Sequence, residues 1–372
     1  MGPSEAGAAR PVVGTYVLAE RGVDVVDRLP PGRVTHLLYA FLLICGEGQR
    51  ASEAEACRGQ PNFGIAPHPD QARFTAAFER LKARDPQVKV LASVGGWGGS
   101  DPFFHLAATA EGRAAFVGAA MRWLREHPVF DGLDIDWEHP GSNGAVNGVA
   151  LGSPADAGNY VRLMQDLRAG LDALGREMAP DGGRRYALTT AIATTREQLA
   201  RMDMGRAAAS LDLVFMMTYD FAGPWTKQAA HHTPLRSARP GEDGSLEASV
   251  ANLLRDGVPA DKLVAGVAMY ARGFDGVQAD RSYARPWPNE DGSVAFKDIG
   301  GLVGMKARFD KATQSWALVG GGRFVGYDDP RAVRAKLAFA RRQGLAGVFA
   351  WELSQDNGEI LDAMNGIRPA AR

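Results

Sequence analysis

Three carboxylates stand at alternate positions in one short segment. Residues 131–138 read DGLDIDWE and include Asp134, Asp136 and Glu138. Side chains alternate between the two faces of a β-strand, so these three share one face and the apolar residues between them share the other. Like charges this close cannot all stay ionised, and burial raises the pKa of a carboxylic acid. The pattern predicts carboxyl groups that share protons, which acid catalysis needs and fold stability does not.

The order of the three carboxylates suggests their roles. Glu138 comes last, at the end of the predicted strand, where a proton donor with a raised pKa is expected. Asp136 lies one pleat behind, within reach of Glu138 or of a substrate, and Asp134 lies deeper and would share a proton with Asp136. Asp131 has the opposite parity and would cap the start of the strand. A metal site is the alternative, but three same-face positions span about 13 Å, too far for one Mg²⁺ or Ca²⁺ ion.

The rest of the chain supplies the elements that must position this strand. Eight short apolar runs alternate with segments of helical periodicity, which is typical of a parallel sheet buried on both faces. The predicted strands are 12–17, 35–41, 89–94, 132–138, 186–193, 211–219, 263–270 and 347–353. The predicted helices are 70–84, 102–127, 156–174, 196–209, 245–256 and 330–343. Eight such strands favour an α/β fold of the closed (β/α)₈ TIM barrel type, whose active sites lie at the carboxyl ends of the strands.

One connection departs from this alternation. Between Tyr270 and Tyr327 the sequence changes to short strand-like pieces separated by Gly, Pro and aromatic residues. A structureless loop of that length is improbable, so a small α+β insertion between strands 7 and 8 is expected at the rim of the site. The predicted domains are a barrel at 11–270 and 326–368 and an insertion at 271–325. Residues 1–10 would be a flexible segment or a remnant of cloning.

Composition excludes several classes of protein. The 42 basic and 43 acidic residues leave a formal charge of −1, which argues against nucleic acid or an anionic membrane as a partner. With 45% hydrophobic and 23% charged residues, the chain has ordinary globular composition. No apolar run reaches the roughly 18 residues of a membrane span. These features predict a soluble, folded protein.

Other conspicuous residues carry weaker signals. The spacing of Cys45 and Cys57 excludes a CxxC metal or redox site and leaves two alternatives open, free thiols or a disulfide that closes a surface loop. His231 and His232 suggest metal ligation, but adjacent strand residues point in opposite directions, so a loop-packing role is favoured. The glycines in residues 93–100 do not have the spacing of a dinucleotide fingerprint, and no cofactor or metal is expected.

Five motifs in barrel order identify a resemblance. DGLDIDWE matches the DxxDxDxE signature of glycoside hydrolase family 18, the chitinases. Four other segments resemble the family's motifs on strands 3, 6, 7 and 8: SVGGW at 93–97, MTYD at 217–220, GVAMYARGF at 266–274 and FAWE at 349–352. The resemblance extends from about residue 12 to residue 367 and is greatest to bacterial chitinases with an α+β insertion between strands 7 and 8. The region around the cysteines also resembles theirs, which favours the disulfide.

The resemblance implies a mechanism. Chitin or N-acetyl-chitooligosaccharides would be cut at β-1,4 bonds with retention of the anomer, and the substrate's own acetamido group would be the nucleophile. Glu138 would be the general acid and base. Asp136 would accept a hydrogen bond from the acetamido N–H, Tyr219 would donate one to the acetamido oxygen, and Asp134 would share a proton with Asp136.

The same resemblance implies the substrate-binding residues. Trp351 would form the floor under the −1 sugar, and Trp97 and Trp225 would be platforms on the aglycone side. The glycines at 93–100 would let the backbone pass close to the sugar. Other cleft-lining positions of the family are matched by Tyr16, Phe41, Met217, Asp220, Tyr270 and Arg272.

The chain departs from the family pattern at the glycone end. Related bacterial enzymes place a sugar-stacking Trp after the first strand, where this chain has Glu20, so a distal glycone subsite is in doubt. Glu290 aligns loosely with an acidic cleft residue. Alternatives to a chitinase are an endo-β-N-acetylglucosaminidase acting on N-glycans and a non-catalytic chitin-binding lectin. A secreted monomer is expected, although residues 1–14 lack the features of a signal peptide.

Overall fold

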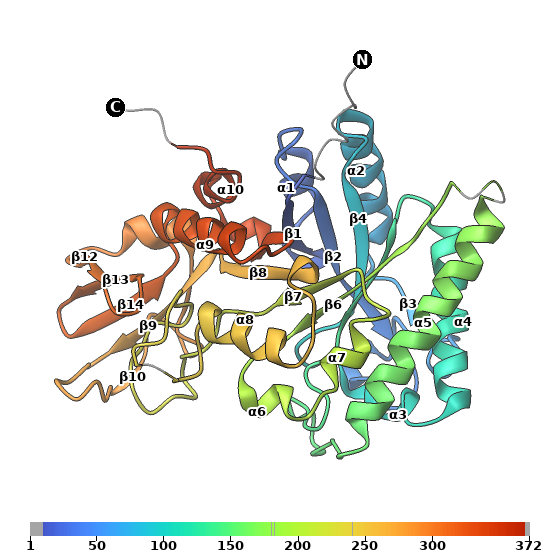
Figure 1. Ribbon diagram of the computed structural model, residues 1–372, viewed down its shortest axis with the longest axis horizontal. Coiled ribbons are helices and arrows are strands. Elements are labelled where there is room, and N and C mark those ends of the chain that lie inside the picture. The colour runs from blue at the N-terminus through green and yellow to red at the C-terminus, as the bar shows by residue number, and fades with distance from the viewer. Residues whose placement is uncertain (1–9, 180, 182, 240, 369–372) are drawn as a thin grey trace.

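Eight parallel strands close into a barrel in the computed structural model, which describes residues 10–179, 181, 183–239 and 241–368 (Figure 1). Each strand pairs with its neighbours in chain order, and β1 pairs with both β2 and β15, which closes the ring. The predicted (β/α)₈ barrel is therefore confirmed. The barrel strands are β1 (Val12–Leu18), β2 (His36–Ile44), β4 (Lys89–Gly95), β5 (Gly132–Asp136), β6 (Ala187–Ile192), β7 (Leu213–Met216), β8 (Leu263–Ala268) and β15 (Gly347–Trp351). The short β3 (Ile65–Ala66) pairs antiparallel with the end of β2.

Helices cover the outside of the barrel. They are α1 (Asp24–Asp27), α2 (Gln71–Arg84), α3 (Asp101–Leu106), α4 (Ala110–Glu126), α5 (Asp156–Met178), α6 (Arg196–Leu199), α7 (Met204–Ala207), α8 (Leu246–Arg255), α9 (Pro330–Arg342) and α10 (Glu359–Met364). Five short 3₁₀ helices lie among them: η1 (Ala19–Arg21), η2 (Ala51–Glu53), η3 (Ala260–Lys262), η4 (Phe296–Gly301) and η5 (Leu353–Gln355).

Two predicted helices are divided in the structure. The predicted helix at 102–127 becomes α3 and α4, because Thr109 accepts a hydrogen bond from the N–H of Gly112 and so begins a new helix. The predicted helix at 196–209 becomes α6 and α7, because Asp203 caps the second piece in the same way. Both caps are Thr or Asp side chains inside a region whose apolar periodicity is continuous.

The barrel separates two apolar clusters. The larger lies between the strands and the helices and contains Leu133, Ile135 and Trp137. The smaller fills the lumen and includes Tyr16 and Phe349, whose ring centroids are 5.9 Å apart. The apolar residues of β5 therefore face the helix layer, as its alternation predicts, and its even-numbered residues face the lumen.

A second sheet is inserted between β8 and β15 and lies beside the barrel, at the left of Figure 1. Its strands are antiparallel: β9 (Tyr270–Asp275), β10 (Arg285–Pro286), β11 (Ser293–Ala295), β12 (Lys306–Asp310), β13 (Ser315–Gly320) and β14 (Arg323–Tyr327). Within residues 270–327, all of which are described, the helical element is the 3₁₀ helix η4. The expected α+β insertion is therefore almost entirely β, and its sheet extends slightly beyond the predicted limits of 271–325.

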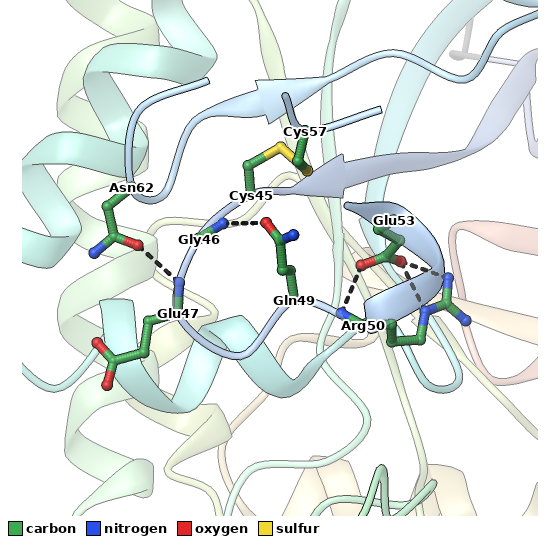
Figure 2. The surroundings of a disulfide bond; sticks show 8 residues. All are labelled: Cys45, Gly46, Glu47, Gln49, Arg50, Glu53, Cys57 and Asn62. Carbon is green, nitrogen blue, oxygen red and sulfur yellow. Dashed lines mark hydrogen bonds and ion pairs between the residues drawn. A yellow bond between two sulfur atoms is a disulfide. The ribbon is translucent and has the colours of Figure 1, made fainter. Parts of the chain in front are cut away.

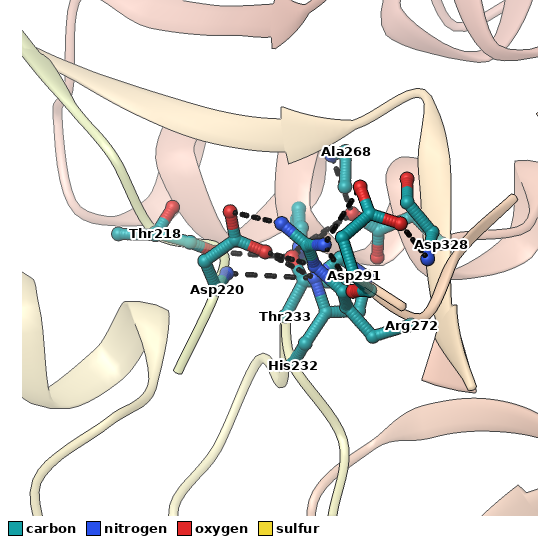
Figure 3. Close-up of polar contacts among 10 residues, drawn as sticks. Thr218, Asp220, His232, Thr233, Ala268, Arg272, Asp291 and Asp328 are labelled. Atoms are coloured by element: carbon teal, nitrogen blue, oxygen red, sulfur yellow. Dashed lines mark hydrogen bonds and ion pairs between the residues drawn. The ribbon is translucent and has the colours of Figure 1, made fainter. Parts of the chain in front are cut away.

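A buried ion pair ties the insertion to the barrel (Figure 3). Asp328, just after β14, accepts hydrogen bonds through Oδ2 from Lys336 Nζ at 2.7 Å, from Thr233 Oγ1 at 3.2 Å and from the N–H of Ala268 at 3.1 Å. Ala268 ends β8 and Lys336 lies on α9, so one carboxylate joins both ends of the insertion to the helix that follows it.

Cys45 and Cys57 form a disulfide with a Cα–Cα distance of 5.3 Å, as the resemblance implied (Figure 2). The enclosed loop is ordered by polar contacts of its own. Gln49 accepts a hydrogen bond from the N–H of Gly46, and Arg50 and Glu53 form an ion pair.

No helix in the described part of the chain is long and apolar enough to cross a membrane. Within residues 10–179, 181, 183–239 and 241–368, no group of three or more His, Cys, Asp or Glu side chains is arranged to hold a metal ion. The expected N-terminal segment at 1–10 lies outside the described residues except for Arg10.

Candidate active site

Strand β5 carries two of the three predicted carboxylates into the lumen. The strand ends at Asp136, so Glu138 lies just beyond it, at the mouth of the barrel. Asp134 and Asp136 are buried, and the Glu138 side chain is 12% exposed. The three therefore lie along one line from the interior to the opening, as the alternation predicts.

Asp134 is the most completely hydrogen-bonded of the three. Its carboxylate accepts hydrogen bonds from Tyr16 Oη at 2.8 Å, Ser93 Oγ at 2.7 Å and Thr189 Oγ1 at 2.7 Å. Burial raises the pKa of Asp134, and these three hydroxyls oppose that rise. No hydrogen bond joins Asp134 to Asp136 in the described part of the chain, so the shared proton stays a prediction.

Asp136, in contrast to Asp134, has a carboxyl oxygen without a hydrogen-bond donor in the part of the chain that the structure describes. Its Oδ1 is buried and accepts no hydrogen bond from any described residue. Burial, followed by the charges of Glu138 and Asp134, raises its pKa well above the ordinary range of an aspartate. A buried carboxyl oxygen without a donor is costly and uncommon, and such oxygens concentrate at sites that bind something.

Glu138 has the pKa expected of a proton donor. Burial, with the nearby negative charge of Asp220, raises its pKa to about 8, so the protonated form predominates at neutral pH. His139 Nε2 lies 3.7 Å from Glu138 Oε2, and burial lowers the pKa of His139 to about 4, so this imidazole is neutral.

Ser100 fixes the backbone on both sides of Trp137. Its Oγ accepts a hydrogen bond from the N–H of Glu138 at 2.9 Å and lies 3.0 Å from the carbonyl oxygen of Asp136 and 2.9 Å from that of Gly96. Sequence reasoning missed this residue. Its signal was its place in the glycine-rich turn after the third barrel strand.

The glycines of that turn allow close contacts within the protein. Gly95 has φ +105°, and a Cβ there would lie 2.3 Å from the carbonyl oxygen of Asp136. Gly96 has φ +77°, and a Cβ there would lie 2.5 Å from the ring of Phe41. Both positions therefore require glycine so that the turn can approach β5 and Phe41. Close approach to a sugar is not needed to explain them.

Tyr219 lies after the end of β7 with its ring in the lumen cluster. Burial, and then the negative charge of Asp136, raises its pKa well above that of an ordinary tyrosine. The hydroxyl therefore stays protonated and able to donate. Tyr270 lies beside it, with ring centroids 6.2 Å apart, and Met217 packs against the same cluster.

Asp220 and Arg272 form a two-point ion pair (Figure 3). Arg272 Nε lies 2.8 Å from Oδ1 and Nη2 lies 3.0 Å from Oδ2. Burial acts against ionisation, but hydrogen bonding by His232 and the charge of Arg272 lower the pKa of Asp220 below its usual range. Arg272 Nη1 also donates to the carbonyl oxygen of Asp291 at 2.7 Å, which connects the pair to the insertion.

His232 does more than the predicted loop packing. It is fully buried against the ring of Tyr270, at 5.0 Å between centroids. Its Nδ1 lies 3.5 Å from Asp220 Oδ1 and 3.4 Å from the N–H nitrogen of Asp220. Adjacent His231 packs instead on Phe324 in the insertion, so the two rings point to different neighbours.

Aromatic side chains form the walls of the opening. Trp351, at the end of β15, stacks on Phe41 with centroids 5.9 Å apart and lies 5.2 Å from Tyr16. Trp97 and Trp225 are 62% and 59% exposed. Trp97 lies edge-on to His139 at 6.4 Å, and Arg272 lies over Trp225 at 5.2 Å. Both tryptophans therefore present exposed apolar rings.

A polar hollow lies where η1 meets the insertion. Glu20, on η1, and Asp291 and Lys297, from the insertion, line a hollow of about 670 Å³ together with Ser354. Glu290 is exposed and does not line this hollow, and its neighbour Asp291 is the residue that contacts Arg272.

Comparison with known proteins identifies the family. Residues 14–356 match the model of Glycosyl hydrolases family 18. The chain belongs to this family. It is 31% identical to chitinase A of Pseudoalteromonas piscicida over 417 aligned residues, which cover 91% of this chain and 50% of that protein. The chain therefore spans about half the length of that relative.

Two solved structures are similar over almost their whole length. A family 18 N-acetylglucosaminidase from Paenibacillus barengoltzii has a TM-score of 0.80 at 28% identity, covering 96% of this chain and 99% of that one. A chitinase-like agglutinin from Robinia pseudoacacia has a TM-score of 0.78 at 26% identity, covering 95% and 98%. The family fold therefore occurs both in a glycosidase and in an agglutinin.

Proposed function

We propose that this protein is a chitinase that hydrolyses β-1,4 bonds between N-acetylglucosamine units by a substrate-assisted, anomer-retaining mechanism. The observation that carries the proposal is Asp136. Its buried Oδ1 has no donor in the described part of the chain, while Asp134 behind it has three. An acetamido N–H would supply the missing donor.

Glu138 supplies the proton that the leaving sugar needs. With a pKa of about 8 it holds this proton at neutral pH, and it lies at the mouth of the barrel, where a glycosidic oxygen can reach it. After the leaving group departs, the same carboxylate accepts a proton from the incoming water. General acid–base assistance of this kind contributes about 10²–10⁴-fold to a rate.

Asp136 and Tyr219 hold the acetamido group in position to attack. Asp136 accepts from its N–H, which turns the carbonyl oxygen toward C1 and stabilises the positive charge that develops on the ring that forms. Tyr219 donates its hydroxyl to the acetamido oxygen. Asp134 is held by its hydroxyl donors and fixes the floor beneath Asp136.

The cleft walls support a linear substrate. Trp351 provides an apolar floor at the −1 position, and the exposed Trp97 and Trp225 provide stacking surfaces for aglycone sugars. At the other end the polar hollow around Glu20 offers hydrogen bonds in place of a stacking ring, which favours short or soluble chains over the crystalline polymer.

Two other functions are alternatives to a chitinase. A chitin-binding lectin would keep the aromatic walls without turnover, but Glu138 is present here and carries a raised pKa. An endo-β-N-acetylglucosaminidase would act on a branched glycan of a glycoprotein instead of a linear chain. The disulfide favours an oxidising, extracytoplasmic compartment, and we propose that the protein is secreted and acts as a monomer.

The deciding experiment measures the products and the anomer released from chitin hexamer. The wild-type protein should release the β-anomer first and leave cellohexaose uncut, because cellohexaose has no acetamido group. E138Q should lose about 10²–10⁴-fold in turnover and still bind the hexamer. Exposed Glu111 on α4 provides the matched control, and E111Q should keep full activity.

Three results would contradict the proposal. Release of the α-anomer would exclude substrate assistance, and full turnover by E138Q would exclude Glu138 as the acid. Binding of the hexamer without any turnover by the wild-type protein would indicate a lectin. Cleavage of a high-mannose glycoprotein in preference to chitin hexamer would indicate the N-glycan enzyme.

A further inference from the structure

A second hollow, of about 430 Å³, lies along α8, away from the catalytic residues. It is within the size range of small-molecule sites. Arginine dominates its lining, with Arg196 at the start of α6, Arg255 at the end of α8, and Arg236 and Arg239 in the segment before α8. None of these residues contributes to the cleft around Glu138.

A buried asparagine holds two of these arginines. Asn252 is almost completely buried, and its Oδ1 accepts from Arg255 Nη2 at 2.8 Å and from Arg196 Nε at 3.4 Å. Its Nδ2 donates to Asp243 Oδ1 at 3.1 Å and to the carbonyl oxygen of Thr194 at 3.4 Å. Both sides of the amide are engaged, so two guanidinium groups are fixed on one neutral oxygen.

Carboxylates of the described residues lie near these groups but do not contact the two central guanidinium groups. Asp243 accepts from the backbone N–H of Arg196 through Oδ2 and from Asn252 through Oδ1. In the described part of the chain no carboxylate oxygen lies within 4 Å of the guanidinium of Arg196 or of Arg255.

Arg236 has a partner in Glu247, but at 3.8 Å it is beyond hydrogen-bonding distance. Arg239 also has a partner, Glu242, at 3.6 Å. With Asp243 counted beside Glu242 and Glu247, the four arginines of the lining outnumber the nearby carboxylates by one.

This arrangement suits one class of ligand. A guanidinium group has five N–H donors in a planar fork that matches the oxygens of phosphate and sulfate. Asn252 uses one donor from each of Arg196 and Arg255, so the others can face the hollow. Because the asparagine already orders both side chains, a ligand would not bear the entropy cost of ordering them.

We propose that this hollow binds a phosphate or sulfate group carried by a ligand about the size of a sugar. The oxyanion lies between Arg196 and Arg255, and the remaining volume along α8 accommodates the ring. This site is separate from the proposed catalytic function and does not depend on it.

Calorimetric titration of the full chain tests the site without chitin. Glucose 6-sulfate and glucose 6-phosphate are the probes, with inorganic sulfate, inorganic phosphate and neutral glucose for comparison. The two sugar esters should bind at one site, more tightly than the inorganic ions, and glucose should not bind there. R196Q/R255Q should weaken ester binding about tenfold or more. Turnover of chitin hexamer should not change.

The control removes the same charge elsewhere. Arg122 on α4 and Arg176 on α5 are exposed, and R122Q/R176Q should keep the affinity of the wild-type protein. Equal weakening by both double variants would reduce the effect to net charge and overturn the site. Absence of saturable binding would also overturn the site. Equal affinity for inorganic sulfate and glucose 6-sulfate would contradict the proposal that the ligand is the size of a sugar.

A second measurement does not depend on the variants' folding. In the wild-type protein, titration with glucose 6-sulfate should shift the side-chain NH₂ resonances of Asn252 and the backbone amides of Ala248 and Ala251, which line the hollow. Shifts confined to the residues around Glu138 would place the ester in the catalytic cleft and overturn the proposal.

Discussion

Arg272 binds the carboxylate of Asp220 through two parallel hydrogen bonds, of 2.8 Å and 3.0 Å. Arg272 comes from the inserted sheet and Asp220 from the turn after β7, so the pair joins the insertion to the barrel mouth. Because Arg272 keeps Asp220 ionised, Asp220 contributes a permanent negative charge close to Glu138. That charge adds to burial in raising the pKa of Glu138.

The first prediction concerns D220N. Glu138 must be protonated to act as an acid, so activity falls as pH rises through its pKa, which is about 8 in the intact site. Removal of the Asp220 charge lowers the pKa of Glu138, and the upper limb of the pH profile of kcat should move to lower pH. Turnover of chitin hexamer measured from pH 4 to pH 10 gives the shift.

Asp291 provides the matched control for this prediction. Its carboxylate lies 3.8 Å from Arg272, but it is not among the charges that raise the pKa of Glu138. D291N should leave the upper limb where it is. An upper limb that stays in place in D220N, or that moves equally in D291N, would contradict the assigned role of Asp220.

The second prediction concerns S100A. Ser100 Oγ accepts from the N–H of Glu138 and lies against the carbonyl oxygen of Asp136, so its loss frees both backbone groups. Loss of hydrogen bonds to buried groups costs about 1–3 kcal/mol, and a misplaced acid lowers kcat. S100A should lower kcat about tenfold or more with little change in KM.

S249A is the control that distinguishes a positioning role of Ser100 from a general effect on stability. It is a buried serine on α8 that bonds the carbonyl oxygen of Ser245 at 2.7 Å, far from Glu138 in the barrel. S249A should lower the melting temperature by a similar amount and leave kcat unchanged. A loss of kcat in S249A equal to that in S100A would make the effect of Ser100 merely structural.

The sequence carries most of the information for the barrel and for its acidic strand. Strand β5 alternates between lumen and helix layer, so a period of two places Asp134 and Asp136 in the lumen. Glu138 follows just beyond the end of the strand. The apolar runs identify all eight barrel strands because each is buried on both faces. Tyr219 lies shortly after β7, and Trp351 is the last residue of β15. Because a barrel brings the carboxyl ends of its strands to one opening, both residues can be expected there.

Contacts between distant segments are harder to predict. The glycine-rich turn places Ser100 after the third barrel strand, but its contact with the backbone of Glu138 depends on how two loops meet. Strand parity argues against metal ligation by His231 and His232, but it does not indicate that His232 lies beside Asp220. The Gly and Pro spacing of the insertion predicts its short strands, but it does not indicate how these strands pair.

The third prediction concerns the disulfide. Cys45 and Cys57 close a loop with a sequence separation of 12, and a loop of about this length is stabilised by about 3 kcal/mol when crosslinked. C45S/C57S should lose about that much unfolding free energy in a chemical denaturation series. The wild-type protein should lose a similar amount in reducing agent, whereas the variant should not respond to it.

The fourth prediction concerns the ion pair between Lys336 and Asp328, both of which are almost completely buried. K336M removes the charged partner and leaves Asp328, among the described residues, with Thr233 and the N–H of Ala268 as its donors. An uncompensated buried charge costs about 3–5 kcal/mol, so the unfolding free energy should fall by about that amount. Lys311 is exposed in the insertion, and K311M should change stability by less than about 0.5 kcal/mol.

The double variant K336M/D328N distinguishes an unpaired charge from lost packing. If the unpaired carboxylate causes the loss, replacing it with a neutral amide should recover a large part of the unfolding free energy, because buried pairs replaced on both sides are often close to neutral. If the double variant is less stable than K336M, the Asp328 carboxylate stabilises the junction through Thr233 and Ala268 independently of Lys336. That result would contradict the ion-pair account. Urea denaturation of the wild-type protein, K311M, K336M and K336M/D328N distinguishes the two explanations.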